Sequence, residues 1–372
     1  MNEPTPADYQ AAGLYDPDDT AIVGRLDLLQ WLIAEGFTIP ELQRGLETGA
    51  LPAMMSDRWL VGGPLIDRAA AIARSGLDEA TFDACTLALG LRPVYGIDDG
   101  VVFTDELLGI YRFAADLGAF FSASEVLALV RTIGTSVARM ADSAVSVFLT
   151  DVESDHVLDG RSEHELGQLV LGATELLEGI GGRIDPILRR HVLQAIERTR
   201  LSQIDAVERF QYQYAVGFVD LVGFTPMSAS LSARELVAFM AEFEARSHTV
   251  VVGCGAQVVK LIGDEVMFVA TDADDGCRAA AALVEAFAAD ADGVAPRGGL
   301  AYGAVALRGG DYFGRVVNLA SRLTDQADPG EVLVGAGIVD AATGCTFRPA
   351  GERRLKGFAD PVTTHALVSR EG

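Results

Sequence analysis

The spacing of apolar residues changes near residue 211, and this change limits the folds that the chain can adopt. From Ile22 to about Arg200, apolar residues recur every three or four positions, as in amphipathic helices, and β-branched alternation is scarce. After Gln211, apolar and polar residues alternate as they do in strands. A chain of 372 residues can form two domains that each bury a core. We therefore expect an all-helical domain followed by one that contains a sheet.

The same pattern sets the expected domain limits. Glycines mark the breaks between helices, including Gly36 and the pair Gly181-Gly182. A charged amphipathic helix from Ile187 to Ile204 is expected to connect the domains. The predicted parts are a flexible polar leader, a helical domain, a helical linker and a sheet-containing domain, at residues 1–20, 21–182, 183–211 and 212–372.

The sheet-containing domain has a recognisable order of elements. Ser232 and Glu235 form a capping-box pattern at the start of a helix that runs toward His248. The order strand, helix, hairpin, helix, strand is ferredoxin-like, so we expect a mixed α+β sheet with helices on one face. Strands are predicted at 212–219, 257–261, 266–270, 299–307 and 332–334, and further helices at 275–289 and 317–324.

The charge of the chain argues against a nucleic-acid partner. Lys and Arg number 29 against 53 Asp and Glu, which gives a formal net charge of -24. Such a charge repels polyanions at long range. Residues 28–46 have the helix, glycine turn, helix pattern of some DNA-binding elements, but only Arg44 is basic on the second helix. We interpret this segment as an ordinary helical hairpin.

Cysteine spacing and hydropathy predict a cytoplasmic, soluble protein. The start of the sequence lacks a basic and then apolar signal, and no apolar run approaches the roughly 20 residues that span a bilayer. We therefore expect no integral membrane segment. The cysteines occur singly, without the C-x-x-C spacing of zinc sites or a disulfide framework, which indicates a reducing compartment: Cys85, Cys254, Cys277 and Cys345.

Two aspartates stand where short apolar runs end. Asp220 lies in Phe218–Thr225, and Asp264 lies in Lys260–Glu265. Carboxylates on neighbouring strand ends can hold hard divalent cations, which prefer oxygen ligands and can clamp phosphates. Either aspartate alone is equally typical of a solvated turn residue, so residues outside the two segments must decide between these interpretations.

The deciding residues are Lys260, four positions before Asp264, and the segment Gly310–Arg322. With them, residues 212–368 resemble the catalytic domain of class III nucleotidyl cyclases, because several separated motifs occur in that family's order and spacing. The resemblance implies an enzyme that converts ATP into 3',5'-cyclic AMP and pyrophosphate.

The resemblance also implies a set of metal ligands and base-reading residues. Asp220 and Asp264 would bind two Mg²⁺ or Mn²⁺ ions per active site, with the Leu221 carbonyl as a further ligand. Lys260 and Asp311 occupy the base-reading positions. Lysine donates and carboxylate accepts, which suits adenine N1 and the N6 amino group, whereas guanine presents the reverse pattern.

Three further residues are assigned to the ribose and phosphates. Asn318 and Arg322 are four apart on a predicted helix and share a face. In the family the asparagine orients the ribose, and the arginine stabilises charge that develops on the α-phosphate. Lys356, in a Leu-Lys-Gly segment that resembles the family's C-terminal motif, is a candidate phosphate ligand.

The family's active site is shared between two catalytic domains, so the resemblance implies a homodimer with two equivalent sites. The helical half resembles the regulatory domain of some actinobacterial-type class III cyclases at Val130–Asp142 and around Arg189-Arg190. In that group the domain restrains the catalytic dimer and can make activity depend on pH. Histidine changes charge near neutral pH, so the candidate sensors are His156, His164 and His191.

Three alternatives remain open at this stage. The first is a guanylate cyclase. The second is a diguanylate cyclase, because Ile262–Glu265 and Gly309–Phe313 faintly resemble that family's hairpin. The third is a catalytically silent nucleotide-binding regulatory module. Lys260 together with Asn318 and Arg322 favours cyclic AMP as the product.

Overall fold

A computed structural model describes residues 4–19, 23–91, 103–152, 160–202, 212–288 and 294–368. The chain divides into two compact units, residues 1–188 and 189–372. No helix within the described ranges combines the length and the hydropathy that crossing a bilayer requires.

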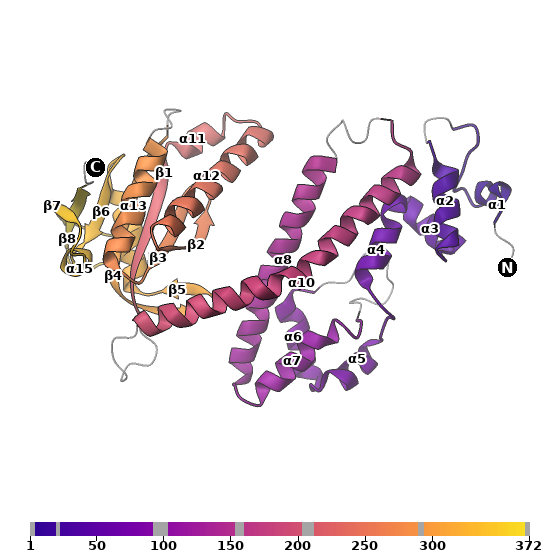
Figure 1. Cartoon of the computed structure of the whole chain (residues 1–372), viewed down its shortest axis with the longest axis horizontal. Coiled ribbons are helices and arrows are strands. Elements are labelled where there is room, and N and C mark those ends of the chain that lie inside the picture. The colour runs from indigo at the N-terminus through magenta and orange to yellow at the C-terminus, as the bar shows by residue number, and fades with distance from the viewer. Residues whose placement is uncertain are drawn as a thin grey trace. The chain divides into compact units, whose positions relative to one another are not determined.

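The described part of the first unit is built from helices, with one isolated β-bridge between Ile66 and Phe103. Figure 1 shows these helices in indigo to magenta. Their bounds are α1 Pro6–Ala11, α2 Arg25–Ala34, α3 Ile39–Glu47, η1 Leu51–Ala53, α4 Met54–Val61, α5 Arg68–Ser75, α6 Glu79–Leu89, α7 Leu108–Gly118, α8 Ala123–Val152 and α10 Glu163–Ser202.

The predicted flexible leader at residues 1–20 is wrong for its described part. Helix α1 begins with a capping box in which Asp8 Oδ2 accepts the Thr5 N–H at 2.7 Å. Tyr9 and Leu14 are buried in one core with residues of α2, including Leu28. The prediction rested on the polar composition of the segment and did not consider these two residues, whose burial stabilises the segment.

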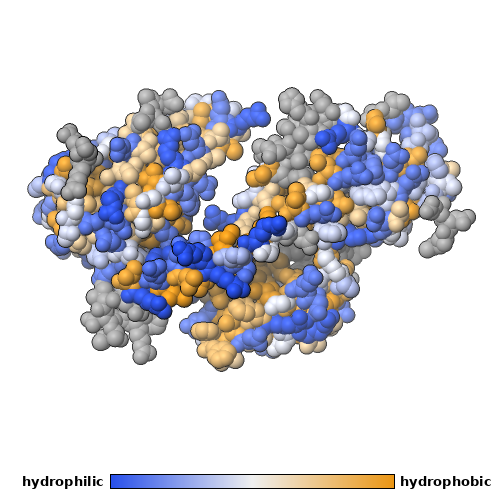
Figure 2. All heavy atoms as spheres, viewed as in Figure 1, coloured by the Kyte–Doolittle hydropathy of each residue, from blue (hydrophilic) through white to orange (hydrophobic). Residues whose placement is uncertain are grey.

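The predicted break at Gly181-Gly182 is also wrong. Helix α10 continues through both glycines and Pro186 to Ser202, so the described part of the predicted helix Ile187–Ile204 belongs to a longer helix. A glycine inside a helix costs only about 1 kcal/mol relative to alanine, so this pair weakens a helix of 40 residues without ending it. Figure 2 shows apolar side chains in orange between hydrophilic ones along this helix.

The second unit contains an eight-stranded mixed sheet, in which β4 pairs parallel with β6 and the other pairings are antiparallel. The strand order is β2-β3-β1-β4-β6-β8-β7, with β5 paired to β4. The order β1-α12-β2-β3-α13-β4 agrees with the ferredoxin-like expectation, and Ser232 caps α12 through the predicted capping box. The strands are β1 Tyr212–Val222, β2 Gln257–Ile262, β3 Glu265–Ala270, β4 Ala295–Arg308, β5 Asp311–Phe313, β6 Val332–Gly335, β7 Thr346–Arg353 and β8 Val362–Val368. The helices are α11 Phe224–Ser228, α12 Ala233–Gly253, α13 Ala273–Ala288, α14 Arg315–Gln326 and α15 Ala336–Ala341.

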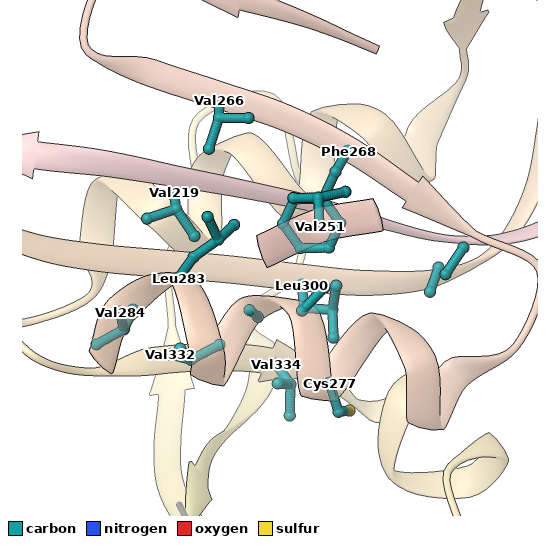
Figure 3. Close-up of a cluster of buried hydrophobic side chains, with 14 of the residues drawn as sticks. Val219, Val251, Val266, Phe268, Cys277, Leu283, Val284, Leu300, Val332 and Val334 are labelled. Carbon is teal, nitrogen blue, oxygen red and sulfur yellow. The ribbon is translucent and has the colours of Figure 1, made fainter. Parts of the chain in front are cut away.

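Strand β1 is covered on both faces. On one face, residues such as Val219 join Phe268 and Leu300 in a core with α12 and α13, where Figure 3 shows Val219, Leu283 and Leu300 close together. On the other face, Phe218 lies in a second core with Ala320 of α14. The prediction that helices cover only one face is therefore wrong. The continuous burial of β1 is typical of a strand that packs on both sides.

Helix α14 lies unusually close to the sheet. A Cβ atom at Gly299 of β4 would lie 2.3 Å from both the Ala320 carbonyl oxygen and the Thr324 nitrogen. The Thr324 hydroxyl also donates to the Phe218 carbonyl at 3.3 Å. The absence of a side chain at Gly299 thus permits the contact that fixes α14, and with it Asn318 and Arg322, against the sheet.

Candidate active site

Asp220 lies near the end of β1, on the sheet face that packs against α14. Its register partners are Glu265 on β3 and Arg297 on β4. Paired residues of antiparallel strands point to the same face, so the three charged side chains are neighbours. The Asp220 side chain is 22% exposed, which leaves its carboxylate accessible at the edge of the core.

Asp264 occupies the two-residue turn between β2 and β3, beside Gly263 at φ 62°. Burial raises the pKa of the Asp264 carboxyl, and the nearby Asp220 carboxylate raises it further. The structure therefore brings together the two aspartates predicted as metal ligands. Two carboxylates that repel each other in this way fit a divalent cation, because the cation offsets their mutual repulsion.

Leu221 is buried directly after Asp220 on β1, and its register partner on β4 is Pro296. Within the described ranges, no three or more His, Cys, Asp or Glu side chains are grouped so as to hold a metal ion by themselves. Ions held by Asp220 and Asp264 would therefore need other oxygen ligands. The Leu221 carbonyl, which the family resemblance implies as a further ligand, is an oxygen of the kind that such ions prefer.

Glu265 and Arg297 were not predicted as part of the site. Burial and then the carboxylates of Asp220, Asp325 and Asp264 raise the pKa of Glu265 to about 7. Arg297 Nη2 donates to Asp220 Oδ2 at 2.9 Å. The predicted strand began at Gly299, four residues after the start of β4 at Ala295. Extending it to Ala295 pairs Arg297 with Asp220, and this register is the signal that sequence reasoning missed.

The predicted base-reading residues are in contact although 51 positions separate them. Lys260 Nζ, on β2, lies 2.5 Å from Asp311 Oδ2, on β5. The other carboxylate oxygen of Asp311 accepts the Tyr312 N–H at 2.9 Å, which orients the side chain. A β-bulge between Val258 and Lys260 changes the register of β2 immediately before the lysine. The Lys260 ammonium group, a donor, and the Asp311 carboxylate, an acceptor, therefore lie side by side.

Asn318, Arg322 and Lys356 line one cavity of about 740 Å³. Asn318 and Arg322 come from α14, whereas Lys356 lies in the connection between β7 and β8. Arg322 Nη1 donates to Asp325 Oδ2 at 2.7 Å. Arg315 also lines the cavity and lies 4.9 Å from the centroid of the Phe358 ring. This arginine was not predicted. Its position at the start of α14, three residues before Asn318, was the available signal.

The histidines proposed as pH sensors have different surroundings. His191 is exposed on α10. The ring of His164 lies edge-on to Trp31 at 5.3 Å, and its Nε2 is 3.0 Å from Gln168 Nε2. His156 lies outside the described residues.

Comparison with known proteins places the chain in a family. It is 31% identical over 359 residues to the uncharacterized protein Rv2212 of Mycobacterium tuberculosis, a match that covers 96% of this chain and 93% of the relative. It is 30% identical over 299 residues to an adenylate cyclase of Glutamicibacter nicotianae, which covers 74% of this chain and 72% of the relative. The chain belongs to the class III adenylate cyclase family. The resemblance inferred from the motifs is thereby confirmed.

A further relative and a solved structure are less similar to this cyclase family member. The pH-sensitive adenylate cyclase MT1302 of M. tuberculosis is 26% identical over 365 residues, which are 94% of this chain and 89% of the relative. No family model matches the chain. Among solved structures, the adenylyl cyclase CyaB of P. aeruginosa is 24% identical, and the match covers 43% of this chain and 95% of that one with a TM-score of 0.37.

Proposed function

We propose that the chain is an adenylate cyclase that converts ATP into 3',5'-cyclic AMP and pyrophosphate. The observation that carries the proposal is the 2.5 Å contact between Lys260 Nζ and Asp311 Oδ2. This pair presents a donor beside an acceptor, which matches N1 and the N6 amino group of adenine. A site that hydrogen-bonds the correct base discriminates strongly, because the wrong base leaves polar groups unpaired.

The proposed roles of the remaining residues follow from their chemistry. Asp220, Asp264 and the Leu221 carbonyl would hold two Mg²⁺ or Mn²⁺ ions. When bound, these ions would acidify the ribose 3'-hydroxyl and neutralise the triphosphate. The 3'-hydroxyl loses its proton to water as its oxygen bonds to the α-phosphorus, and the bond from that phosphorus to the oxygen that bridges to the β-phosphate breaks, which releases pyrophosphate.

The cavity residues act on the ribose and phosphates in this proposal. Asn318 donates to the ribose and orients its 3'-hydroxyl toward the α-phosphorus. Arg322 directs its forked N–H donors at the charge that develops on the α-phosphate. Lys356 contacts the phosphates. The shared cavity of these three residues supports a common substrate region.

We infer that two chains share each active site, with the metal aspartates from one chain and Lys260, Asp311, Asn318 and Arg322 from its partner. Each chain contains both sets of residues, so a two-fold dimer would have two equivalent sites. Any signal that changes how the two chains of the dimer are arranged would then change the rate of cyclic AMP formation.

We further propose that the N-terminal helical part restrains the catalytic part through α10. Ser202, the last residue of α10, lies 3.5 Å from the Tyr214 hydroxyl through its own hydroxyl. Tyr214 packs edge-on against Tyr312 at 5.2 Å, and Tyr312 directly follows Asp311. A shift of the end of α10 would therefore reach the base-reading pair through packed side chains.

A product assay tests the enzymatic proposal. The purified chain is incubated with Mn²⁺ and either ATP or GTP, and cyclic AMP, cyclic GMP and cyclic di-GMP are resolved by mass spectrometry. We expect cyclic AMP and pyrophosphate from ATP, and loss of both in Asn318→Ala. Cyclic GMP or cyclic di-GMP as the main product would replace the proposal with the corresponding guanine enzyme. Nucleotide binding without any cyclic product would indicate a silent module.

A further inference from the structure

Arg297 makes the most extensive contacts of the charged groups around the predicted metal ligands. Its Nε and Nη2 both donate to Asp220 Oδ2, at 3.1 and 2.9 Å. Its Nη1 donates to the Asp325 backbone carbonyl at 3.0 Å. One guanidinium thus connects the end of β1 to the end of α14.

The carboxylates around Arg297 make it a counter-cation. The carboxylates of Asp220, Asp325 and Asp264 raise the pKa of Glu265, whereas the positive charge of Arg297 lowers it. The Arg297 and Asp220 side chains are 24% and 22% exposed, so water screens their attraction only in part. The Asp325 carbonyl holds the guanidinium in place independently of Asp220.

We propose that Arg297 is a positioning residue that competes with divalent cations for Asp220 and thereby sets the metal affinity of the nucleotide-free site. This inference rests on the proposed function, in which Asp220 and Asp264 hold the metal ions. A cation that binds Asp220 Oδ2 must displace two N–H donors and approach a fixed positive charge. Both effects oppose binding of a free ion.

If Arg297 competes with metal ions for Asp220, substitutions that weaken its contact with Asp220 should raise the affinity for Mn²⁺. Arg297→Gln removes the charge and the forked donors, so Mn²⁺ should bind about ten-fold more tightly in the absence of nucleotide. Arg297→Lys keeps the charge but loses the two-donor contact with Asp220, so its affinity should lie between those of the wild type and Arg297→Gln.

The test is a titration of the full-length chain with Mn²⁺ at pH 8, in which free Mn²⁺ is followed by electron paramagnetic resonance. Thermal melting and size-exclusion chromatography verify that each variant folds. The expected order of affinity is Gln, then Lys, then Arg at residue 297. Equal or weaker binding by Arg297→Gln would overturn the inference. If Arg297→Gln does not fold, Arg297→Lys is the test variant. Mn²⁺ binding by Arg297→Lys that is no tighter than in the wild type would then overturn the inference.

Asp220→Ala separates failure of this inference from failure of the proposed function. If Asp220→Ala abolishes Mn²⁺ binding while substitution of Arg297 leaves it unchanged, the metal site stands and the role of Arg297 is wrong. If Asp220→Ala binds Mn²⁺ as the wild type does, the metal assignment fails, and the inference fails with it.

Discussion

Lys260 and Asp311 lie on strands β2 and β5, and their side chains meet at 2.5 Å. Neither residue alone distinguishes a nucleotide site from an ordinary surface ion pair. Their proposed function depends on the side-by-side donor and acceptor, which Tyr312 helps to orient through its N–H bond to Asp311. At the scale of single residues, we therefore expect the proposed recognition of adenine to be sensitive to substitution of either residue.

We predict that Lys260→Ala lowers kcat/KM for ATP by about 10- to 100-fold, the effect of losing one charged hydrogen bond. The measurement is cyclic AMP formation at saturating Mn²⁺. Arg234→Ala, which removes an exposed positive charge on α12, is the matched control and should retain wild-type kinetics. Unchanged kcat/KM in Lys260→Ala would remove the lysine from the base-reading role.

Motif spacing identified the residues that project from strand ends and from one helix face, and the structure brings several of them together. Asp220 lies near Asp264, and Lys260 contacts Asp311. Asn318 and Arg322 line the same cavity. Arg297 could not be found in this way, because its partner is set by the register between β1 and β4. Register is a tertiary property that local patterns specify only weakly.

Among the secondary-structure elements, α14 has the greatest effect on the site because it carries both Asn318 and Arg322. Its distance from the sheet is set at Gly299, where an added Cβ would meet backbone atoms of α14 at 2.3 Å. Backbone atoms cannot rotate away as a flexible side chain can, so the whole helix must move.

We predict that Gly299→Ala lowers the free energy of unfolding by about 1–3 kcal/mol or more and reduces kcat by displacing α14. Denaturant unfolding and cyclic AMP formation measure the two effects. Gly253→Ala is the matched control, because its Cβ would meet no atom within 4 Å. Identical stability and turnover in the two variants would show that the close approach at Gly299 is unimportant.

Local patterns predicted the helical character of the first part and several elements of the second, and their errors have physical reasons. The alternation after residue 211 identified β1, β2, β3, β4 and β6 but not β5, β7 and β8, and the capping box located the start of α12. The helix break at Gly181-Gly182 was wrong because a glycine costs a helix only about 1 kcal/mol relative to alanine, and α10 is 40 residues long. The face covered by α14 was missed because periodicity does not say which side of a doubly buried strand a helix occupies.

At the scale of the whole molecule, the two compact units meet in sequence within α10. We predict that a chain shortened to residues 183–372 has a higher kcat than the full-length protein at neutral pH, because the proposed restraint by the first unit is removed. Cyclic AMP formation is compared at equal dimer fractions, determined by light scattering. A shortened dimer no faster than the full-length dimer would contradict autoinhibition.

The central claim is an adenylate cyclase whose active sites are assembled from two chains, and complementation tests it most directly. Asp220→Ala and Asn318→Ala chains carrying different tags are co-expressed, and the mixed dimer is isolated by tandem purification. We predict about half of the wild-type cyclic AMP turnover per dimer, because one of its two sites is intact. The matched control, a mixed dimer of Asp220→Ala and Asp264→Ala, should be inactive because both sites lack a metal ligand. A mixed Asp220→Ala and Asn318→Ala dimer as inactive as this control would contradict the claim.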